Sequence, residues 1–303
     1  MTVVGPGTEV EDRVHESPGT DPAPRLRKSY KHRILAIWPY VLMVPVALTW
    51  VYPFVWMVTS SFKSNSEMFG STSLIPESFH WENWQRAWYQ VDIGRYFGNT
   101  VFVTVATIFI VVATSSMIGY VLGRYTFPGK KIVIAAFIAT VLVPEGYTII
   151  PLFDLINNLG LGGSLWGVVL AESGGAHVMI ILLFAGYFRQ IPNEIEEAAQ
   201  IDGAGFVRQF FTIMLPLTKP VVATAVILTL MRSWNSFLIP LVLTLSNPDA
   251  RTLAVGVYSF QGENMTDWTG MTAASTISLL PIVIVFLFLQ RYFIEGMTGA
   301  VRG

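Results

Sequence analysis

Five polar side chains lie inside stretches of sequence that are otherwise apolar enough to cross a lipid bilayer. They are Glu145, Glu172, His177, Arg232 and Asn235, and Trp234 stands between the last two. An ionisable group at membrane depth is costly unless it faces water, protein or an opposite charge. Carboxylates and histidine relay protons in transporters, whereas polar side chains beside an aromatic ring suit a sugar. The candidates for a translocation path are therefore Glu145, Glu172, Arg232, Trp234 and Asn235.

A structural interpretation of the same side chains is favoured over a direct role in transport. Glu172 or Glu145 would pair with Arg232 or contact a partner subunit. His177 has no second histidine or carboxylate four residues on, which favours a hydrogen-bonded, packed role over a metal site. No nucleophile–base pair and no pair of catalytic carboxylates is present. The sequence therefore predicts that the chain alone is not an enzyme and binds no metal or cofactor.

A second pattern lies in the polar segment 189–219. Pro192 and Asn193 are typical of a helix start, with Asn193 as the N-cap. Three glutamates follow in the first turn, where the helix dipole favours acids: Glu194, Glu196 and Glu197. Gly203 and Gly205 then end the helix and permit a sharp turn.

The predicted helix has an apolar face that is followed by a second apolar stripe. The i, i+3, i+4, i+7 face consists of Ile195, Ala198, Ala199 and Asp202. Its two alanines form a flat patch that another surface can approach closely. The second stripe consists of Val207, Phe210, Phe211 and Met214, before Pro216 and Pro220. Two interpretations are open: a rigid handle for a cytoplasmic partner, or an interfacial helix without a partner.

The composition indicates a membrane protein without its own energy source. Of 303 residues, 52% are hydrophobic and 13% charged, against about 25% charged in soluble domains. The net charge of −1 gives no indication of a nucleic-acid partner. The absence of cysteine excludes disulfides, thiolate metal sites and cysteine nucleophiles. Since Gly129-Lys130-Lys131 lacks the upstream glycine and the hydroxyl residue of a P-loop, energy must come from another polypeptide or an ion gradient.

Six stretches approach or exceed the length of about 20 residues that a helix needs to cross a bilayer. They are 34–58, 99–122, 132–153, 165–188, 220–245 and 273–293. The predicted fold is therefore all-α, an integral membrane protein with six transmembrane helices. Residues 144–146 interrupt the third stretch, and 172–177 interrupt the fourth with polar groups that should face protein or water.

The distribution of lysine and arginine predicts the orientation. Of the 19 lysine and arginine residues, 14 lie in 1–33, in the loops after the second and fourth spans, or at the C-terminal end. Four lie in the loops on the other side of the membrane, and Arg232 lies within a span. The positive-inside rule then places both termini in the cytoplasm. An even number of spans requires the same arrangement.

The predicted organisation is a polar, disordered tail at 1–33, a permease domain at 34–293 and a short C-terminal tail at 294–303. The external segment 61–97 carries Trp81, Trp84 and Trp88, with Tyr89 and Tyr96. Aromatic residues of this kind anchor at membrane boundaries. A packed interfacial cap with short helices is favoured there over a docking surface for an external protein.

The segment Glu197-Ala198-Ala199, three residues, Gly203, nine residues, Ile213, one residue, Leu215-Pro216 resembles the EAA motif of ABC import permeases. It also lies where that family has it, before the fifth of six spans. Further likenesses point to the carbohydrate-uptake branch and its maltose-type second permease. They are Asp202-Gly203-Ala204, Leu159-Gly160-Leu161, Phe188 with Ile191-Pro192, Trp234-Asn235 and the tail 296–303. The resemblance extends over about 34–303.

This resemblance implies a type I ABC importer permease fold with a cytoplasmic coupling helix in the cell membrane. The residues implied to contact a separate ATPase are Glu197, Ala198, Ala199, Asp202 and Gly203, with Ile213, Leu215 and Pro216 fixing the loop to the membrane core. Implied partners are a second homologous permease, two copies of an ATPase that binds ATP and Mg, an extracytoplasmic sugar-binding protein and membrane lipid. In such importers the sugar contacts lie mainly in the other permease.

The alternative function is a proton-coupled secondary transporter that uses Glu145, Glu172 and His177. Such proteins usually contain two related halves, and 34–153 and 165–293 show no clear repeat. A membrane-embedded enzyme or a structural anchor is a third hypothesis, for which no paired catalytic groups are visible.

Overall fold

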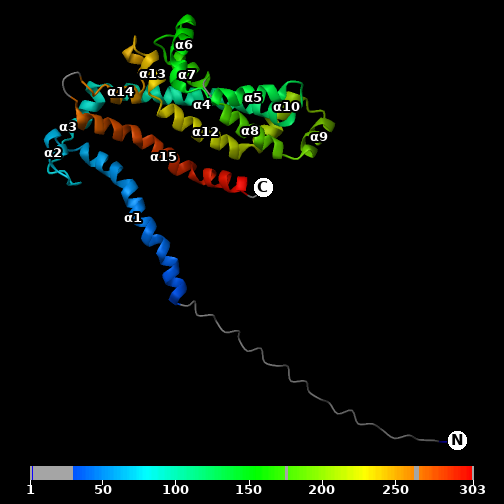
Figure 1. The fold of residues 1–303 in the computed structure, drawn as a ribbon, viewed down its shortest axis with the longest axis horizontal. Helices are drawn as coiled ribbons and strands as arrows, with labels where there is room; N and C mark the ends of the chain where they lie inside the picture. Colours follow the sequence, from blue (N-terminus) through cyan, green and yellow to red (C-terminus); the bar gives the residue numbers. More distant parts are fainter. Residues whose placement is uncertain (1, 3–29, 175–176, 263–265, 302–303) are drawn as a thin grey trace. The chain divides into compact units, whose positions relative to one another are not determined.

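The computed structural model describes residues 2, 30–174, 177–262 and 266–301. Their regular structure is helical, and an isolated β-bridge joins Gln261 to Thr266. The chain divides into two compact units, 1–52 and 53–303. Helix α1 (Tyr30–Ser60) begins in the first unit and ends in the second, which holds the remaining helices (Figure 1).

The helices of the second unit follow one another in four stretches. First come α2 (Asn65–Gly70), α3 (Glu82–Gln85) and the π-helical turn η1 (Arg86–Gln90). The long helix α4 (Ile93–Arg124) precedes α5 (Lys130–Val141), α6 (Glu145–Asn158), α7 (Leu165–Gly174) and α8 (Val178–Gln190). Next are α9 (Asn193–Ile201), α10 (Phe206–Gln209), the π-helical turn η2 (Phe210–Met214), α11 (Leu215–Leu217) and α12 (Lys219–Trp234). The last are α13 (Leu238–Leu243), the 3₁₀ turn η3 (Pro248–Ala250), α14 (Leu253–Tyr258) and α15 (Trp268–Val301).

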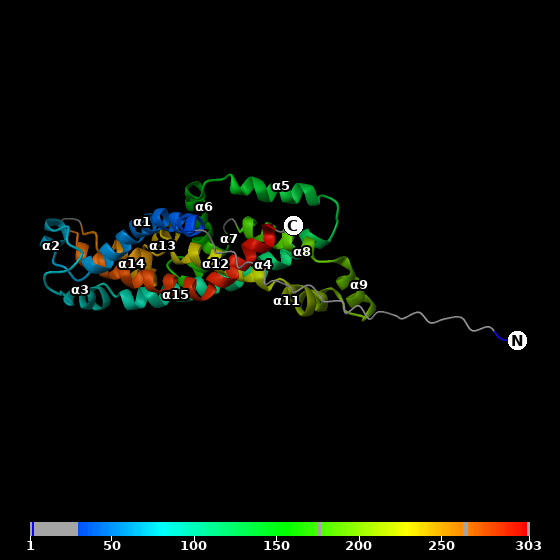
Figure 2. The same cartoon turned by 90° about the horizontal axis from the view of Figure 1, so that it is seen from below.

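Helix α4 is central to the second unit. It packs against α7, α8 and α12, and α12 packs against α15 (Figures 1 and 2). Gly119 and Gly123 face α8 so closely that a Cβ on Gly119 would fall 2.5 Å from Cβ of Phe184. Small residues four apart allow this approach, since helices in lipid associate by close packing and not by hydrophobic burial. The crossing therefore fixes α8 and the segment that follows it.

An apolar core at one end of the bundle joins the segment 189–219 to α4 and α8. Its buried members include Tyr120 of α4, Phe184 and Phe188 of α8, and Phe210 and Met214 of η2. The rings of Tyr120 and Phe210 lie 5.3 Å apart, and those of Tyr120 and Phe188 lie 5.2 Å apart. Side chains that the sequence places in a surface loop are thus part of the core.

Three of the described helices are long and apolar enough to span a membrane, namely Pro39–Ser60, Ile93–Arg124 and Trp268–Phe288. Three pairs of helices pass the same test of length and composition but are bent. The bend is 106° between Lys130–Val141 and Gly146–Asn158, 54° between Leu165–Gly174 and Val178–Gln190, and 79° between Phe206–Leu217 and Lys219–Trp234. If each bent pair crosses once, the described residues contain six spans, which is the predicted number, but the third pair covers 206–234 and not the predicted 220–245.

The structure corrects the continuity of several predicted spans. The third is broken near Pro144, which precedes α6, because proline disfavours helical geometry in the residue before it. The predicted fifth span 220–245 is not one helix, since α12 ends at Trp234 and α13 starts at Leu238. The bend of the fourth span includes 175–176, which lie outside the described residues.

The boundaries of the helices also differ from the predicted ones. Helix α4 starts at Ile93 instead of 99, and α15 continues to Val301 through most of the predicted tail 294–303. The predicted N-terminal tail lies outside the described residues apart from residue 2 and 30–33.

The segment 61–97 forms the short helices predicted for it and packs as a cap. Trp81 and Trp84 stack with ring centroids 5.6 Å apart, and both stack on Phe62. Arg86 Nε donates a hydrogen bond of 2.6 Å to Asp267 Oδ2, immediately before α15. These contacts favour the packed interpretation of this segment.

We expect Gly119→Ala to destabilise the folded chain by about 1–3 kcal/mol, because its methyl group overpacks the crossing with α8. The matched control is Gly98→Ala on the same helix, where a Cβ meets nothing within 4 Å. This control should be neutral or stabilise by about 0.5–1 kcal/mol. The thermal midpoint in detergent measures both, and equal midpoints for the two variants would contradict the role of the crossing.

Candidate functional site

Helix α9 lies at the end of the second unit opposite α3 and α14 (Figures 1 and 2). The predicted helix in this segment is confirmed, with one correction at its N-cap and one at Glu197, which lies after the first turn and not within it. Pro192 occupies the N-cap position and Asn193 is the first helical residue, so no side chain caps the helix. Glu194 and Glu196 lie in the first turn, where carboxylates interact favourably with the helix dipole.

A buried ion pair attaches α9 to the last residue of α4. Arg124 Nε donates to Glu196 Oε2 at 2.8 Å, and Nη2 of the same guanidinium lies 2.7 Å from that oxygen. The Tyr120 hydroxyl donates to Glu196 Oε1 at 2.8 Å. The side chains of Arg124 and Glu196 are only 5% and 15% exposed. We call Arg124, Tyr120 and Glu196 the Arg124 clamp.

The clamp also reaches the end of α8. Arg124 Nη1 donates to the carbonyl oxygens of Ile191 at 2.7 Å and Phe188 at 3.3 Å. Carbonyls in the last turn of a helix have no partner within the helix. One guanidinium therefore joins α4, α8 and α9.

Sequence reasoning selected Glu197 and missed Glu196 and Arg124. The acidic first turn and the basic end of a span were both visible. Their pairing was not, because the two residues are 72 positions apart in the chain.

The two alanines of the predicted flat patch do not share a surface. Ala199 is 5% exposed and faces the bundle with half-buried Ile195, whereas Ala198 and Glu197 are exposed. Ile201 is 87% exposed at the end of the same helix. The outward face of α9 is therefore centred on Glu197 and Ile201, with Ala198 beside them.

The turn after α9 requires a glycine at one position. Gly203 has φ +75°, in the left-handed region that glycine adopts most easily. Its N–H donates to Gln200 O at 3.0 Å, and Ala204 N–H donates to Ala199 O at 2.9 Å. This pair of bonds is a Schellman motif. Asp202, before the turn, is exposed, and Gly205 has φ −70°, so only the first glycine is conformationally required.

The residues of the second predicted apolar stripe, in the second half of the segment 189–219, do not all face the core. Phe210 and Met214 are buried, whereas Val207 and Phe211 are more than half exposed. Ile213 and Leu215 pack partly buried against the same core as Phe210, and Pro216 is exposed.

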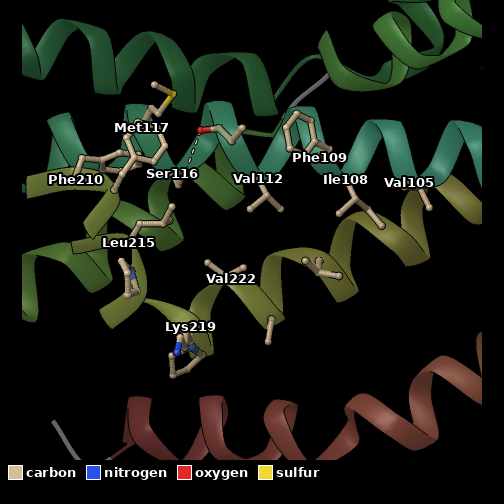
Figure 3. Close-up of a pocket in the computed structure, with 16 residues that line it drawn as sticks. Val105, Ile108, Phe109, Val112, Ser116, Met117, Phe210, Leu215, Lys219 and Val222 are labelled. Atoms are coloured by element: carbon tan, nitrogen blue, oxygen red, sulfur yellow. Dashed lines mark hydrogen bonds between the residues drawn. The ribbon is translucent and has the colours of Figure 1, made fainter. Parts of the chain in front are cut away.

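A groove of about 1130 Å³ lies between α4 and the segment from η2 to α12 (Figure 3). Leu215 and Pro216 belong to its lining, and only Ser116 and Lys219 among its sixteen lining residues are polar. The Ser116 hydroxyl already donates to Ala113 O at 3.0 Å. The groove therefore offers little to a polar solute.

Buried polar groups gather where the bent helices are interrupted. Glu172 is 2% exposed, and its carboxylate accepts a hydrogen bond from the Ser236 hydroxyl. His177 Nε2 lies 2.8 Å from Glu172 O. Glu172 and Arg232 both have interaction partners. This arrangement favours the structural interpretation of Glu172 and His177.

The remaining candidates for a translocation path do not form a sugar site together. Trp234 is 6% exposed, donates from Nε1 to Ser278 O at 3.1 Å and packs edge-on against Phe97. This burial does not support its predicted stacking on a sugar. Asn235 is exposed but donates to Met231 O at 2.7 Å. Glu145 starts α6, and its side chain lies outside the described part of the structure.

Comparison with known proteins gives a consistent result over most of the chain. Residues 115–299 match the family described as binding-protein-dependent transport system inner membrane component. The probable ABC transporter permease YurM of Bacillus subtilis is 34% identical, over 88% of each chain. The diacetylchitobiose uptake permease NgcG of Streptomyces coelicolor is 32% identical, over 86% of this chain and 84% of its own. The melibiose/raffinose/stachyose import permease MelC of Bacillus subtilis is 31% identical, over 87% and 95%.

The fold has a solved counterpart. A chain of a bacterial ABC transporter involved in the import of alginate matches with a TM-score of 0.76 and 24% identity, over 88% of this chain and 98% of that chain. With this architecture and the matched residues 115–299, the chain belongs to the family of binding-protein-dependent transport system inner membrane components, which are permease subunits of ABC transporters.

Proposed function

We propose that this chain is the permease subunit of an importer that carries sugars into the cell. Two of the relatives are named for the uptake of oligosaccharides. The chain would form half of the translocation pathway, and a second homologous permease would form the other half. An extracytoplasmic sugar-binding protein would deliver the substrate.

The observation that carries the proposed mechanism is the rigid attachment of α9 through the Arg124 clamp. A surface helix held by a buried ion pair moves with the bundle and does not swing freely. We propose that its outward face, with Glu197, Ala198 and Ile201, contacts a separate ATPase. Asp202 and Gly203 would shape the end of this contact, and Ala199 would hold α9 to the bundle from the inner side.

The sequence of events follows from this attachment. Two copies of the ATPase, with ATP and Mg bound, would close on each other and carry α9 with them. The clamp would pass the displacement to α4, which packs against α7, α8 and α12. Ile213, Leu215 and Pro216 would carry it into α12. Such rigid-body motion between two states is how a ligand shifts access across a membrane protein.

The proposed orientation places both termini and α9 in the cytoplasm. It rests on the 14 lysine and arginine residues on one side of the predicted spans against four on the other. The cap formed by 61–97 would then face the exterior, at the end of the second unit opposite α9 (Figure 2).

Uptake should depend on ATP and not on a proton gradient. In cells that express the complete importer, arsenate depletion of ATP should abolish uptake of a labelled sugar. An uncoupler should leave initial uptake largely intact while ATP is maintained. The reverse pattern would support a proton-coupled transporter and contradict the proposed function.

Replacement of Ile201 by glutamate should weaken the association with the ATPase. Burial of an isoleucine is worth about 1.5–3 kcal/mol, so its loss lowers affinity at least about tenfold. Co-purification of the ATPase with the tagged permease measures this effect. Gln200→Glu introduces the same charge at the neighbouring exposed residue and should have a smaller effect. Normal co-purification of Ile201→Glu would exclude this face as the contact.

Removal of one charge from the clamp should uncouple ATP hydrolysis from uptake. Glu196→Gln leaves Arg124 buried without its counter-ion, which costs about 3–5 kcal/mol in typical buried pairs. We expect at least a tenfold fall in sugar carried per ATP hydrolysed, with the ATPase still bound.

Two variants control this experiment. Glu194→Gln, at an exposed glutamate of the same turn, should retain coupling. The double variant Arg124→Gln/Glu196→Gln should recover part of it, because no unpaired charge remains. A wild-type ratio of sugar to ATP in Glu196→Gln would show that the clamp is dispensable.

A further inference from the structure

A small pocket lies at the break between α12 and α13, away from the apolar groove. Its volume is about 420 Å³, within the range of ligand pockets in proteins. Phe237 from the break and Tyr258 from the end of α14 form one side, with ring centroids 5.3 Å apart and planes inclined by 60°. Gln261, Ser275 and Ser278 supply its polar groups. Half of Tyr258 is exposed, so the ring is accessible.

The interrupted helix gives the pocket a physical rationale. Non-helical backbone at membrane depth is tolerated where protein buries it or where it lines a cavity. Residues 235–237 separate α12 from α13 and include Phe237, which lines the pocket. Secondary transporters build substrate sites from interrupted helices, and we apply the same physical argument to this permease.

The polar groups of the pocket are available for a ligand. Thr272 and Thr276 on α15 donate to carbonyls of their own helix at 2.9 and 2.7 Å. Ser275 and Ser278 on the same helix make no side-chain hydrogen bond to any described residue, and neither does the amide of Gln261. Hydroxyl groups in a helix that do not form hydrogen bonds with their own backbone can form them with a bound solute.

The chemistry of this lining selects the class of ligand. Two aromatic rings, an amide and hydroxyls are present, and none of the described residues that line the pocket is charged. Such a surface offers apolar ring faces and neutral hydrogen-bonding groups, which match the two kinds of surface on an uncharged sugar ring.

We infer that Phe237, Tyr258, Gln261, Ser275 and Ser278 form a subsite of this chain for one neutral sugar ring on the translocation path. The inference rests on the proposed function as a sugar importer and adds a contact within this permease. Resemblance to the maltose-type branch implied that the sugar contacts lie mainly in the other permease.

Cysteine protection tests the subsite directly, because the chain contains no cysteine of its own. Single variants Ser275→Cys and Ser278→Cys are prepared in the complete importer and treated with a methanethiosulfonate reagent. The labelling of this subunit is followed by mass spectrometry. Melibiose, raffinose and diacetylchitobiose are screened for ATP-dependent uptake, and a sugar that is taken up serves as the probe.

We expect the probe sugar to slow labelling of Ser278→Cys at least fivefold. The control is Ser259→Cys, at an exposed serine outside the pocket, whose labelling should not change. A thiol at 278 that is inaccessible in the complex, or that the transported sugar does not protect, overturns the subsite.

Uptake kinetics give a second readout. Phe237→Ala and Tyr258→Ala should raise KM for the probe sugar about tenfold while the ATPase still co-purifies. Tyr258→Phe keeps the ring and should stay within threefold of the wild type. Unchanged KM in both alanine variants overturns the subsite alone. Failure of all three sugars to be taken up with ATP would overturn the proposed sugar function and the subsite together.

Discussion

The attachment of a surface helix to a membrane bundle depends here on one buried ion pair. Arg124 and Glu196 are almost fully removed from solvent, where an unpaired charge is strongly unfavourable. Each therefore requires the other, and α9 cannot separate from α4 without exposing a charge to solvent or leaving a buried charge without its counter-ion. The close crossing of α4 and α8 at Gly119 supports this arrangement. It fixes the position of the carbonyl oxygens at the end of α8 that accept hydrogen bonds from Arg124. A force applied to α9 thus reaches the centre of the bundle.

Local chemistry made α9 and its turn predictable from the sequence. Proline, a glutamate-rich first turn and glycine at 203 determine where a helix begins and ends, and all three act within a few residues. The direction in which α9 faces was not predictable in this way. The burial of Ala199 and the exposure of Ala198 depend on tertiary contacts, among them the bond of Glu196 to a charge 72 residues away. Periodicity identifies a face but not which neighbour covers it.

The number of apolar stretches was likewise visible, but their continuity was not. Pro144 marked one break, whereas the weaker stop signals at the end of α12, Arg232 in its last turn and Asn235 at its C-cap, were interpreted as polar groups within a continuous span. Trp234 consequently seemed open to a sugar in sequence and is packed in the structure. The family supports the expectation that the chain is a transport subunit and not an enzyme, and it favours ATP-driven transport over a proton-coupled carrier.

The geometry around Arg124 restricts which residue can occupy that position. Its planar guanidinium meets two carbonyl oxygens and a carboxylate from different directions at once. An ammonium group carries the same charge but presents it as a compact point on a flexible stem. A lysine at 124 could neutralise Glu196 yet would leave the Ile191 carbonyl, just after α8, without the hydrogen bond that Arg124 Nη1 donates to it. In chains of this architecture, an exchange of arginine for lysine there should therefore be accompanied by a new donor near the end of α8.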